Sequence, residues 1–363
     1  MTDPADGGRP AARLGIFDFE GRAAPGLYAA GWGLLVLGLA ALIIGLAAAG
    51  SSGPAAPVLF VGGLGIIGVA FLAAAGAQGL QRAAEGAANG AADRAANGAA
   101  NGAANGAVRG AASTGGGAAY AGPSPFLVFG AALVLALFVS YCLTFIFTLA
   151  GFVPGGQLAL VLTVVIDAGV ALGCIRLVVV GPGALTWAEM GFRRPRPGEG
   201  SMAQDIGWGM ALAIPAFTAG YLLAVALQVL LGAVPESPIP LTRDPSGVLL
   251  NLAAAAAISP LWEETFFRGF ATTAWARAIG DRSAIIRGAL FFAAVHVLGV
   301  TGVDFSSAIR VALIAFAVRI PVGLFLGWAL LRRRTLAAPI ALHATYNAVP
   351  IVLFAVLGAA AGG

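Results

Sequence analysis

The chain has 363 residues, of which 59% are hydrophobic and 10% are charged, and its formal net charge is +4. Soluble globular proteins have about 45–50% apolar and about 25% charged residues, so too few charges remain here to cover a water-facing surface. The high hydrophobicity also excludes a disordered chain. The two cysteines, Cys142 and Cys174, both lie within apolar runs, which excludes a secreted disulfide scaffold.

Apolar stretches long enough to cross a membrane recur along the chain. A spanning segment needs about 20 mostly apolar residues, and such a run must be helical in lipid. The sequence therefore predicts an all-α, polytopic transmembrane helix bundle with about nine spans, within a range of eight to ten. The predicted spans are residues 28–50, 56–79, 126–152, 158–180, 208–231, 248–277, 283–300, 308–331 and 336–358. The eighth contains Arg310, Arg319 and Pro321, which is compatible with one kinked helix or with two shorter ones.

The distribution of arginine predicts the orientation of these spans. If the N-terminus is cytoplasmic, fifteen of the twenty basic residues, all arginines, fall in inside segments, whereas Arg243 and Arg310 fall outside. This asymmetry predicts an N-in, C-out protein. We expect it to lie in the lipid bilayer of the bacterial cytoplasmic membrane. Because the arginines do not form one stripe, we expect no nucleic-acid partner.

Composition divides the chain into four parts. Residues 1–27 are polar and are predicted to be a cytoplasmic N-terminal tail, since nothing there resembles a cleavable signal. Residues 28–80 form a two-span N-terminal piece, and 123–363 form a seven-span body. Between them, residues 81–122 are a low-complexity segment that begins with tetrads of the Asn-Gly-Ala-Ala type. Since each glycine costs a helix roughly 1 kcal/mol relative to alanine, this segment is predicted to be a flexible cytoplasmic linker.

Few ionisable side chains lie within the predicted spans, and such residues are functional-site candidates because they are costly at membrane depth. Both histidines of the chain are among them. Asp167 and Arg319 have no evident role and are interpreted as structural polar contacts within the bundle. The full set, with one neighbouring amide, is Asp167, Glu263, Glu264, Arg268, His296, Arg319, His343 and Asn347.

Helical spacing indicates which of these side chains can meet. Glu264 and Arg268 are four residues apart, so they share a helix face and can form an ion pair inside the bundle. Glu263 lies about 100° around the same helix and is left free for another task. His343 and Asn347 also share one face. Pro260, just before the acidic pair, can interrupt its helix and admit water.

A glutamate, two histidines and an amide are a suitable set for hydrolysis. The carboxylate can take a proton from water, imidazole can share that task or donate to an oxyanion, and the amide can donate to the oxyanion. Alternatively, Glu263, His296 and His343 could hold a zinc ion. A proton or ion relay also fits these residue types.

Three short motifs resemble those of a known protein family. Glu263-Glu264-Thr265-Phe266-Phe267-Arg268 matches Glu-Glu-x-x-x-Arg, Phe292 to His296 matches Phe-x-x-x-His, and His343 to Asn347 matches His-x-x-x-Asn. Their order and spacing resemble the CAAX-protease and bacteriocin-processing (CPBP, or Abi) family of intramembrane proteases, which includes the Ras-converting CAAX prenyl proteases. The resemblance covers about residues 247–357.

The resemblance implies an intramembrane endopeptidase that hydrolyses a membrane-associated or lipidated protein or peptide. It implies that Glu263 is catalytic and activates water with His296, and that His343 and Asn347 stabilise the oxyanion. Glu264, Arg268 and Phe292 match supporting positions. The family was long described as metalloproteases, so zinc is an alternative, although the favoured interpretation requires no cofactor. We expect the four catalytic candidates to converge on one water-filled cavity.

Two other functions remain open at this stage. The chain could be a non-proteolytic membrane scaffold or bacteriocin-immunity protein on the same fold. It could also be a proton- or ion-coupled transporter, which internal repeats with paired broken helices would favour. The sequence shows no such repeat between its halves.

Overall fold

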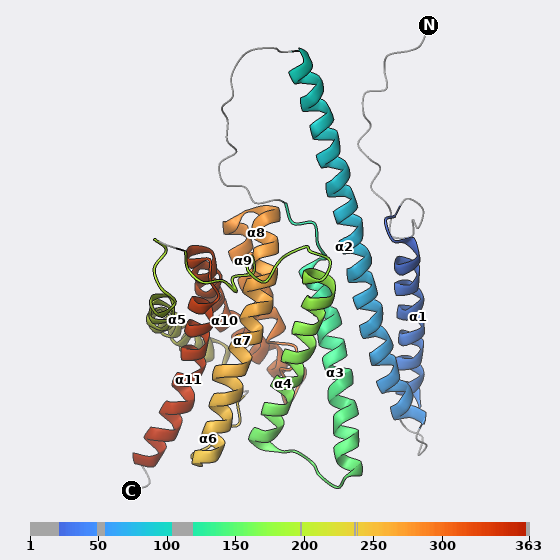
Figure 1. Ribbon diagram of the computed structural model, residues 1–363. Helices are drawn as coiled ribbons and strands as arrows, with labels where there is room; N and C mark the ends of the chain where they lie inside the picture. Colours follow the sequence, from blue (N-terminus) through green and yellow to red (C-terminus); the bar gives the residue numbers. More distant parts are fainter. Residues whose placement is uncertain are drawn as a thin grey trace.

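The computed structural model describes residues 22–48, 55–103, 119–196, 198–235, 237 and 239–360, and the regular elements among them are all helices (Figure 1). Within these ranges, eight helices are long and apolar enough to cross a membrane. This confirms the predicted all-α, polytopic bundle. The spanning helices are α1 (Pro25–Ala47), α2 (Ala55–Ala103), α3 (Pro125–Leu149), α4 (Gly156–Ile175) with η1 (Arg176–Val180), α5 (Met202–Leu231), the continuous helix Pro245–Ile279, α10 (Phe305–Arg333) and α11 (Ala337–Ala360).

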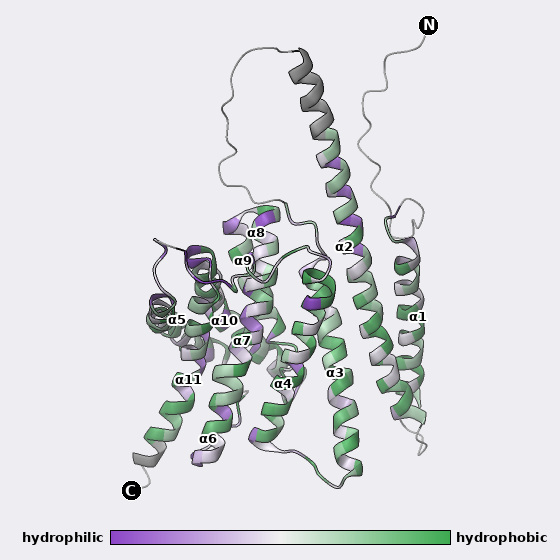
Figure 2. Cartoon of the chain, in the orientation of Figure 1, coloured by the Kyte–Doolittle hydropathy of each residue, from purple (hydrophilic) through white to green (hydrophobic). Residues whose placement is uncertain are grey.

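Large apolar side chains on the outside of these helices face the surroundings rather than a protein core. Leu149 of α3 and Val229 of α5 are 73% and 82% exposed, respectively. Figure 2 shows hydrophobic residues along α1, α3 and α4, whereas hydrophilic residues gather around α8 and on the part of α2 that extends beyond the bundle. Exposed apolar surface of this extent is expected where lipid replaces water.

The helix Pro245–Ile279 carries the first motif and changes its winding four times. It consists of α6 (Pro245–Asn251), η2 (Leu252–Ile258), α7 (Ser259–Glu264), η3 (Thr265–Thr272) and α8 (Thr273–Ile279), in which η2 and η3 are π-helical. Asp244 caps its start by accepting a hydrogen bond from the Gly247 amide at 2.8 Å. The suggestion that Pro260 interrupts this helix was wrong, because the wider π-helical winding next to it lets the helix continue.

The seventh predicted span, 283–300, differs from the structure. Its helix, α9 (Asp281–Val295), has 15 residues, which corresponds to about 22 Å and is less than the ~30 Å of a bilayer core. It is therefore not among the eight long spans, and His296 lies at its C-terminal cap. The start of α1 and the end of α11 nevertheless lie at opposite ends of the bundle (Figure 1). This arrangement requires an odd number of crossings, so α9 and residues 296–304 together account for one.

The eighth predicted span is a single helix, α10, which continues through Pro321. Close packing against α9 supports it at this point. A Cβ atom added to Gly323 would lie 2.9 Å from the Ala289 Cα, so only glycine allows the two backbones to approach this closely. α10 thereby holds the short α9 in place beside it.

The prediction of a flexible segment from residue 81 was wrong for its first part, because α2 continues as a helix to Ala103. The helix is already formed within the preceding apolar residues, so its extension needs no new nucleation. Side-chain contacts also hold the region just beyond that span: Gln81 accepts a hydrogen bond from the Ala23 amide, and Arg82 donates to the Gly122 carbonyl. Most of residues 1–27, and residues 104–118 of the linker, lie outside the described residues.

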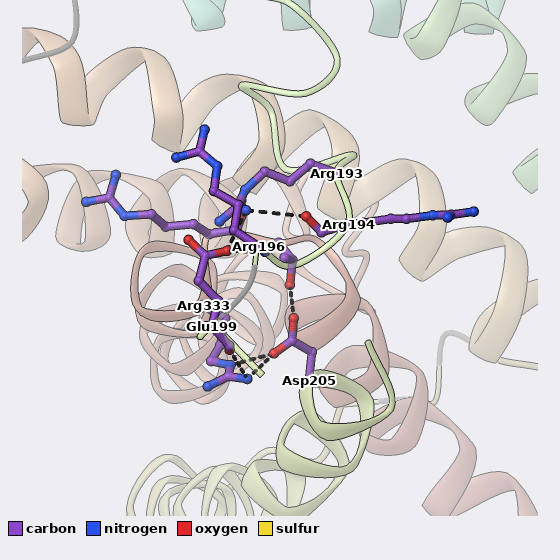
Figure 3. Close-up of polar contacts among 8 residues, drawn as sticks. Arg193, Arg194, Arg196, Glu199, Asp205 and Arg333 are labelled. Carbon is purple, nitrogen blue, oxygen red and sulfur yellow. Dashed lines mark hydrogen bonds and ion pairs between the residues drawn. The ribbon is translucent and has the colours of Figure 1, made fainter. Parts of the chain in front are cut away.

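A polar network joins three distant segments at one end of the bundle (Figure 3). Asp205, near the start of α5, accepts hydrogen bonds from Arg333 and from Thr335 Oγ1, the latter at 2.6 Å. In the preceding loop, a hydrogen bond from the Arg193 guanidinium is the main reason that the pKa of Glu199 is lowered to about 2. Two arginine-rich segments predicted to be cytoplasmic therefore lie together at the same end of the structure.

We predict that this end faces the cytoplasm. Reporter domains inserted at Gly198, in the arginine-rich loop, and at Gly232, at the other end of α5, should report opposite sides of the membrane. Gly198 should be cytoplasmic because arginine is retained on that side. Paired phosphatase and fluorescent-protein fusions measure this directly. A periplasmic signal at Gly198 would contradict the predicted orientation.

Candidate active site

Glu264 is the centre of a buried polar cluster that joins two helices. Its side chain is fully buried, and its Oε1 accepts hydrogen bonds from Arg268 Nη1 at 3.0 Å and from His343 Nδ1 at 2.7 Å. Arg268 is one turn further along the same helix, whereas His343 belongs to α11. The predicted Glu264–Arg268 ion pair is therefore present, and it also holds the second histidine.

Phe292 packs against this cluster from α9. The centre of its ring lies 4.2 Å from the guanidinium carbon of Arg268 and 5.7 Å from the centre of the His343 ring. The ring face attracts the cation, so Phe292 stabilises the buried guanidinium and shields it from water. Its backbone carbonyl also accepts a hydrogen bond from His296 Nδ1 at 2.7 Å. Phe292 thus contacts both predicted histidines.

Glu263 points away from the Glu264 cluster and towards His296. Its Oε1 accepts a hydrogen bond from Ser259 Oγ, and its Oε2 lies 3.6 Å from His296 Nε2. That separation is too long for a direct hydrogen bond and is of the size at which a water molecule can bridge two polar groups. Oε2 is buried and has no hydrogen-bond partner in the described part of the chain. One oxygen of the carboxylate is therefore fixed by Ser259, and the other is available for a reacting molecule.

Glu263 and His296 line a cavity of about 210 Å³ between α3, α4, α7 and α9. Apolar side chains from α3 and from the start of η3 form most of its wall. One further ionisable residue, Asp167 of α4, lines the same space. The polar lining residues are Asp167, Trp262, Glu263 and His296.

Asn347 lies one turn beyond His343 on α11, but its amide is used differently from expectation. Its Nδ2 donates a hydrogen bond to the Ala255 carbonyl at 2.8 Å. In the π-helical register of η2, that carbonyl would accept from the amide of residue 260, but residue 260 is proline and has no N–H. Asn347 supplies the missing donor, and one N–H of its amide group remains for another acceptor.

Hydroxyl groups support the second π-helical segment, η3. Thr272 Oγ1 donates to the Phe267 carbonyl at 2.8 Å, and Thr273 Oγ1 donates to the Arg268 carbonyl at 3.3 Å, each five residues back. π-Helical segments are rare and often occur at functional sites. Here η2 and η3 flank the six-residue α7 that carries both glutamates, so the sequence positions these carboxylates with unusual backbone winding on both sides.

The predicted residues are close together but form two groups rather than one. Glu263 and His296 line the cavity, whereas His343 and Asn347 are not among its lining residues and bind Glu264 and Ala255 instead. The structure thus places two of the four on the wall of this cavity, and the convergence of all four on one substrate stays a prediction. Asp167, interpreted from the sequence only as a structural contact, lies on the cavity wall. The sequence signal for Asp167 as a site residue was a carboxylate within a predicted membrane span.

The described residues do not include a cluster of three or more histidine, cysteine, aspartate or glutamate side chains suited to hold a metal ion. In particular, Glu263, His296 and His343 do not form such a cluster in the described part of the chain. The arrangement therefore does not fit a site in which these three side chains hold zinc.

Comparison with protein families supports the resemblance seen in the motifs. Residues 245–349 match the family described as type II CAAX prenyl endopeptidase, Rce1-like, and this match covers under a third of the chain. This match supports the CPBP/CAAX-protease resemblance for the C-terminal part of the chain. Comparison with curated proteins and with solved structures gave no match in either case. CPBP/CAAX-protease membership supports a membrane endopeptidase, and the matched segment contains both glutamates, both histidines and Asn347.

We predict that Arg268 in this CPBP-type core is required mainly for folding. Removing one partner of a buried ion pair costs about 3–5 kcal/mol, because the other charge is left buried and unpaired. Arg268→Ala should therefore lower both the yield of folded protein and its unfolding temperature in detergent. Arg277→Ala is a matched control, since its pair with Glu189 is partly exposed, and such pairs contribute only about 0–1 kcal/mol. Equal thermal stability of the two variants would contradict the structural role of Arg268.

Proposed function

We propose that this chain is an intramembrane endopeptidase of the bacterial cytoplasmic membrane. It hydrolyses a peptide bond of a membrane-associated or lipidated protein or peptide, using water activated by Glu263 and His296. The observation that carries this proposal is the pair of acceptor atoms, Glu263 Oε2 and His296 Nε2, which face each other at 3.6 Å on the wall of a membrane-embedded cavity.

The hydrogen bond to Phe292 determines the proton position on His296. A backbone carbonyl can only accept, so His296 Nδ1 carries the hydrogen, and Nε2 of the neutral ring is an acceptor. A water molecule between Nε2 and Glu263 Oε2 can donate one hydrogen to each of these atoms. Its lone pairs then remain directed at a substrate carbonyl, which is the arrangement that general-base catalysis needs.

His343 can assist the developing oxyanion only in one protonation state. Since its Nδ1 donates to the Glu264 carboxylate, Nε2 carries a hydrogen only when the ring is an imidazolium. Arg268 orients the Glu264 carboxylate that holds His343. Asn347, with one amide hydrogen not used by Ala255, is the second proposed donor to the oxyanion.

The reaction follows from these positions. The water oxygen bonds to the carbonyl carbon while Glu263, assisted by His296, takes its proton. The carbonyl oxygen becomes an oxyanion, which His343 and Asn347 stabilise. Protonated Glu263 then gives the proton to the amide nitrogen, the C–N bond breaks, and the carboxyl and amine products leave. Every step uses side chains of this chain and one water molecule.

The decisive experiment replaces the proposed base. Glu263→Gln keeps the size of the side chain but cannot accept a proton, so cleavage of a quenched fluorescent farnesyl-cysteine peptide should fall by at least about 100-fold. The measurement uses the full chain in lipid nanodiscs, with Glu189→Gln on the surface as the control variant. Unchanged thermal stability should accompany the loss of activity. Full cleavage by Glu263→Gln would overturn the proposal.

We also predict that activity needs no bound zinc, because Glu263 and His296 are proposed to activate water directly. Elemental analysis of purified active enzyme should give far less than one zinc per chain, and dialysis against a chelator should leave the cleavage rate unchanged. Stoichiometric zinc whose removal abolishes activity and whose return restores it would contradict this prediction.

A further inference from the structure

Asp167 is a carboxylate in the active-site cavity that the proposed mechanism does not use. It belongs to α4, outside the segment that matches the protease family. It lines the same cavity as Glu263 and His296 and lies close enough to Glu263 for their charges to interact. Because an ionisable residue at membrane depth is costly, its position next to the reacting groups requires a physical reason.

The other carboxylates within the bundle have partners, but the side chain of Asp167 has none. Glu264 binds Arg268 and His343, Asp205 binds Arg333 and Thr335, and Glu263 binds Ser259. In the described ranges, the structure gives Asp167 no side-chain hydrogen bond and no ion pair. Its carboxylate is therefore available to a molecule that enters the cavity.

Two arginines lie near the cavity, but neither is among the residues that line it. Arg268 is fully buried against Glu264 and Phe292. Arg319 of α10 donates from Nη1 to the Ala315 carbonyl and is not among the residues that line the cavity. The cavity is therefore lined by two carboxylates and by no arginine, so a cationic group that enters it can pair directly with Asp167.

The rest of the wall is suited to the stem of a long side chain. Phe129, Ala132 and Leu133 of α3 and Phe266 of η3 supply apolar surface beside Asp167. Lysine and arginine have apolar stems that pack on such surfaces while the charged end reaches a polar group. At about 210 Å³ the cavity is smaller than the ~300–1,000 Å³ typical of sites for drug-sized ligands, which suits a single side chain.

We propose that Asp167 binds the cationic side chain of a substrate lysine or arginine near the scissile bond, so that the enzyme prefers basic residues there. This inference rests on the proposed function. The carboxylate and the ammonium or guanidinium group would form charge-assisted hydrogen bonds, which are the strongest in proteins. The same contact would hold the neighbouring peptide carbonyl at the water between Glu263 and His296.

The test measures selectivity with matched peptides. Farnesyl-cysteine peptides that differ only in lysine or norleucine, placed at one position at a time, are offered to the full chain in nanodiscs. At one position the wild type should prefer lysine by about tenfold or more in kcat/KM, and the difference should lie mainly in KM. A tenfold change corresponds to about 1.4 kcal/mol, within the range of hydrogen bonds to charged groups.

Variants of Asp167 then test the origin of the preference. Asp167→Asn should bring the lysine-to-norleucine ratio close to one, and Asp167→Glu should retain part of it, since the charge remains. Asp281→Asn, on the cytoplasmic end of α9, is the control and should keep the wild-type ratio. A wild type without lysine preference, or a preference that persists in Asp167→Asn, would overturn the inference.

A binding measurement separates this inference from the proposed function. Nα-acetyl-lysine amide should change the tryptophan fluorescence of the wild type at lower concentration than Nα-acetyl-norleucine amide, because Trp262 lines the cavity. Asp167→Asn should remove this difference. Peptides that are cleaved no faster by the wild type than by Glu263→Gln would contradict the proposed endopeptidase, while the binding result would still decide the role of Asp167. Equal binding of both amides by the wild type would overturn that role.

Discussion

The arrangement of the site depends on one buried charge, the carboxylate of Glu264. A fully buried carboxylate is tolerated only with partners, and here one oxygen accepts from both Arg268 and His343. The interaction therefore does more than neutralise charge, since it ties the helix Pro245–Ile279 to α11. Glu263 directly precedes Glu264 in the sequence. Fixing Glu264 on one side of the helix therefore directs Glu263 to a different side, where His296 and the cavity lie. Consecutive glutamates thus serve different purposes through helix geometry alone.

The unusual winding of this helix follows from the same need to satisfy polar groups in a membrane. Lipid offers no donor for a free carbonyl, so each change of register must be repaired from within the protein. Pro260 removes the amide that would bind the Ala255 carbonyl, and Asn347 replaces it from α11. The hydroxyls of Thr272 and Thr273 likewise donate to carbonyls of η3, those of Phe267 and Arg268. Asn347, which the family resemblance associates with the oxyanion, therefore also supports the helix backbone at η2. Substitutions of Asn347 are expected to affect both the proposed oxyanion contact and this backbone hydrogen bond.

Sequence reasoning predicted the features that depend on local spacing and missed those that depend on packing between helices. The Glu264–Arg268 pair follows from a four-residue separation, and the positions of the long spans follow from apolar runs. The bond between His343 and Glu264 joins residues 79 positions apart, and no periodicity specifies it. The early end of α9 was missed because residues 296–300 are apolar enough to continue a span. The extension of α2 to Ala103 was missed because propensity was judged without the preceding helix, which supplies the nucleus.

The three carboxylates near the active site differ in how completely the protein satisfies them, and this difference orders their roles. Glu264 is held by an arginine and a histidine and is structural in the first place. Glu263 has one oxygen bound by Ser259, and its other oxygen lies opposite His296 at the cavity, which suits a base that must be positioned and yet react. Asp167 has no side-chain partner among the described residues and lines the cavity, so its carboxylate is available to a group that enters. Since a carboxylate is costly at this depth, a bound cationic group would offset part of that cost. On the proposed function, the active site extends beyond the family motifs to α4, where the seven-span body adds Asp167 to the protease core.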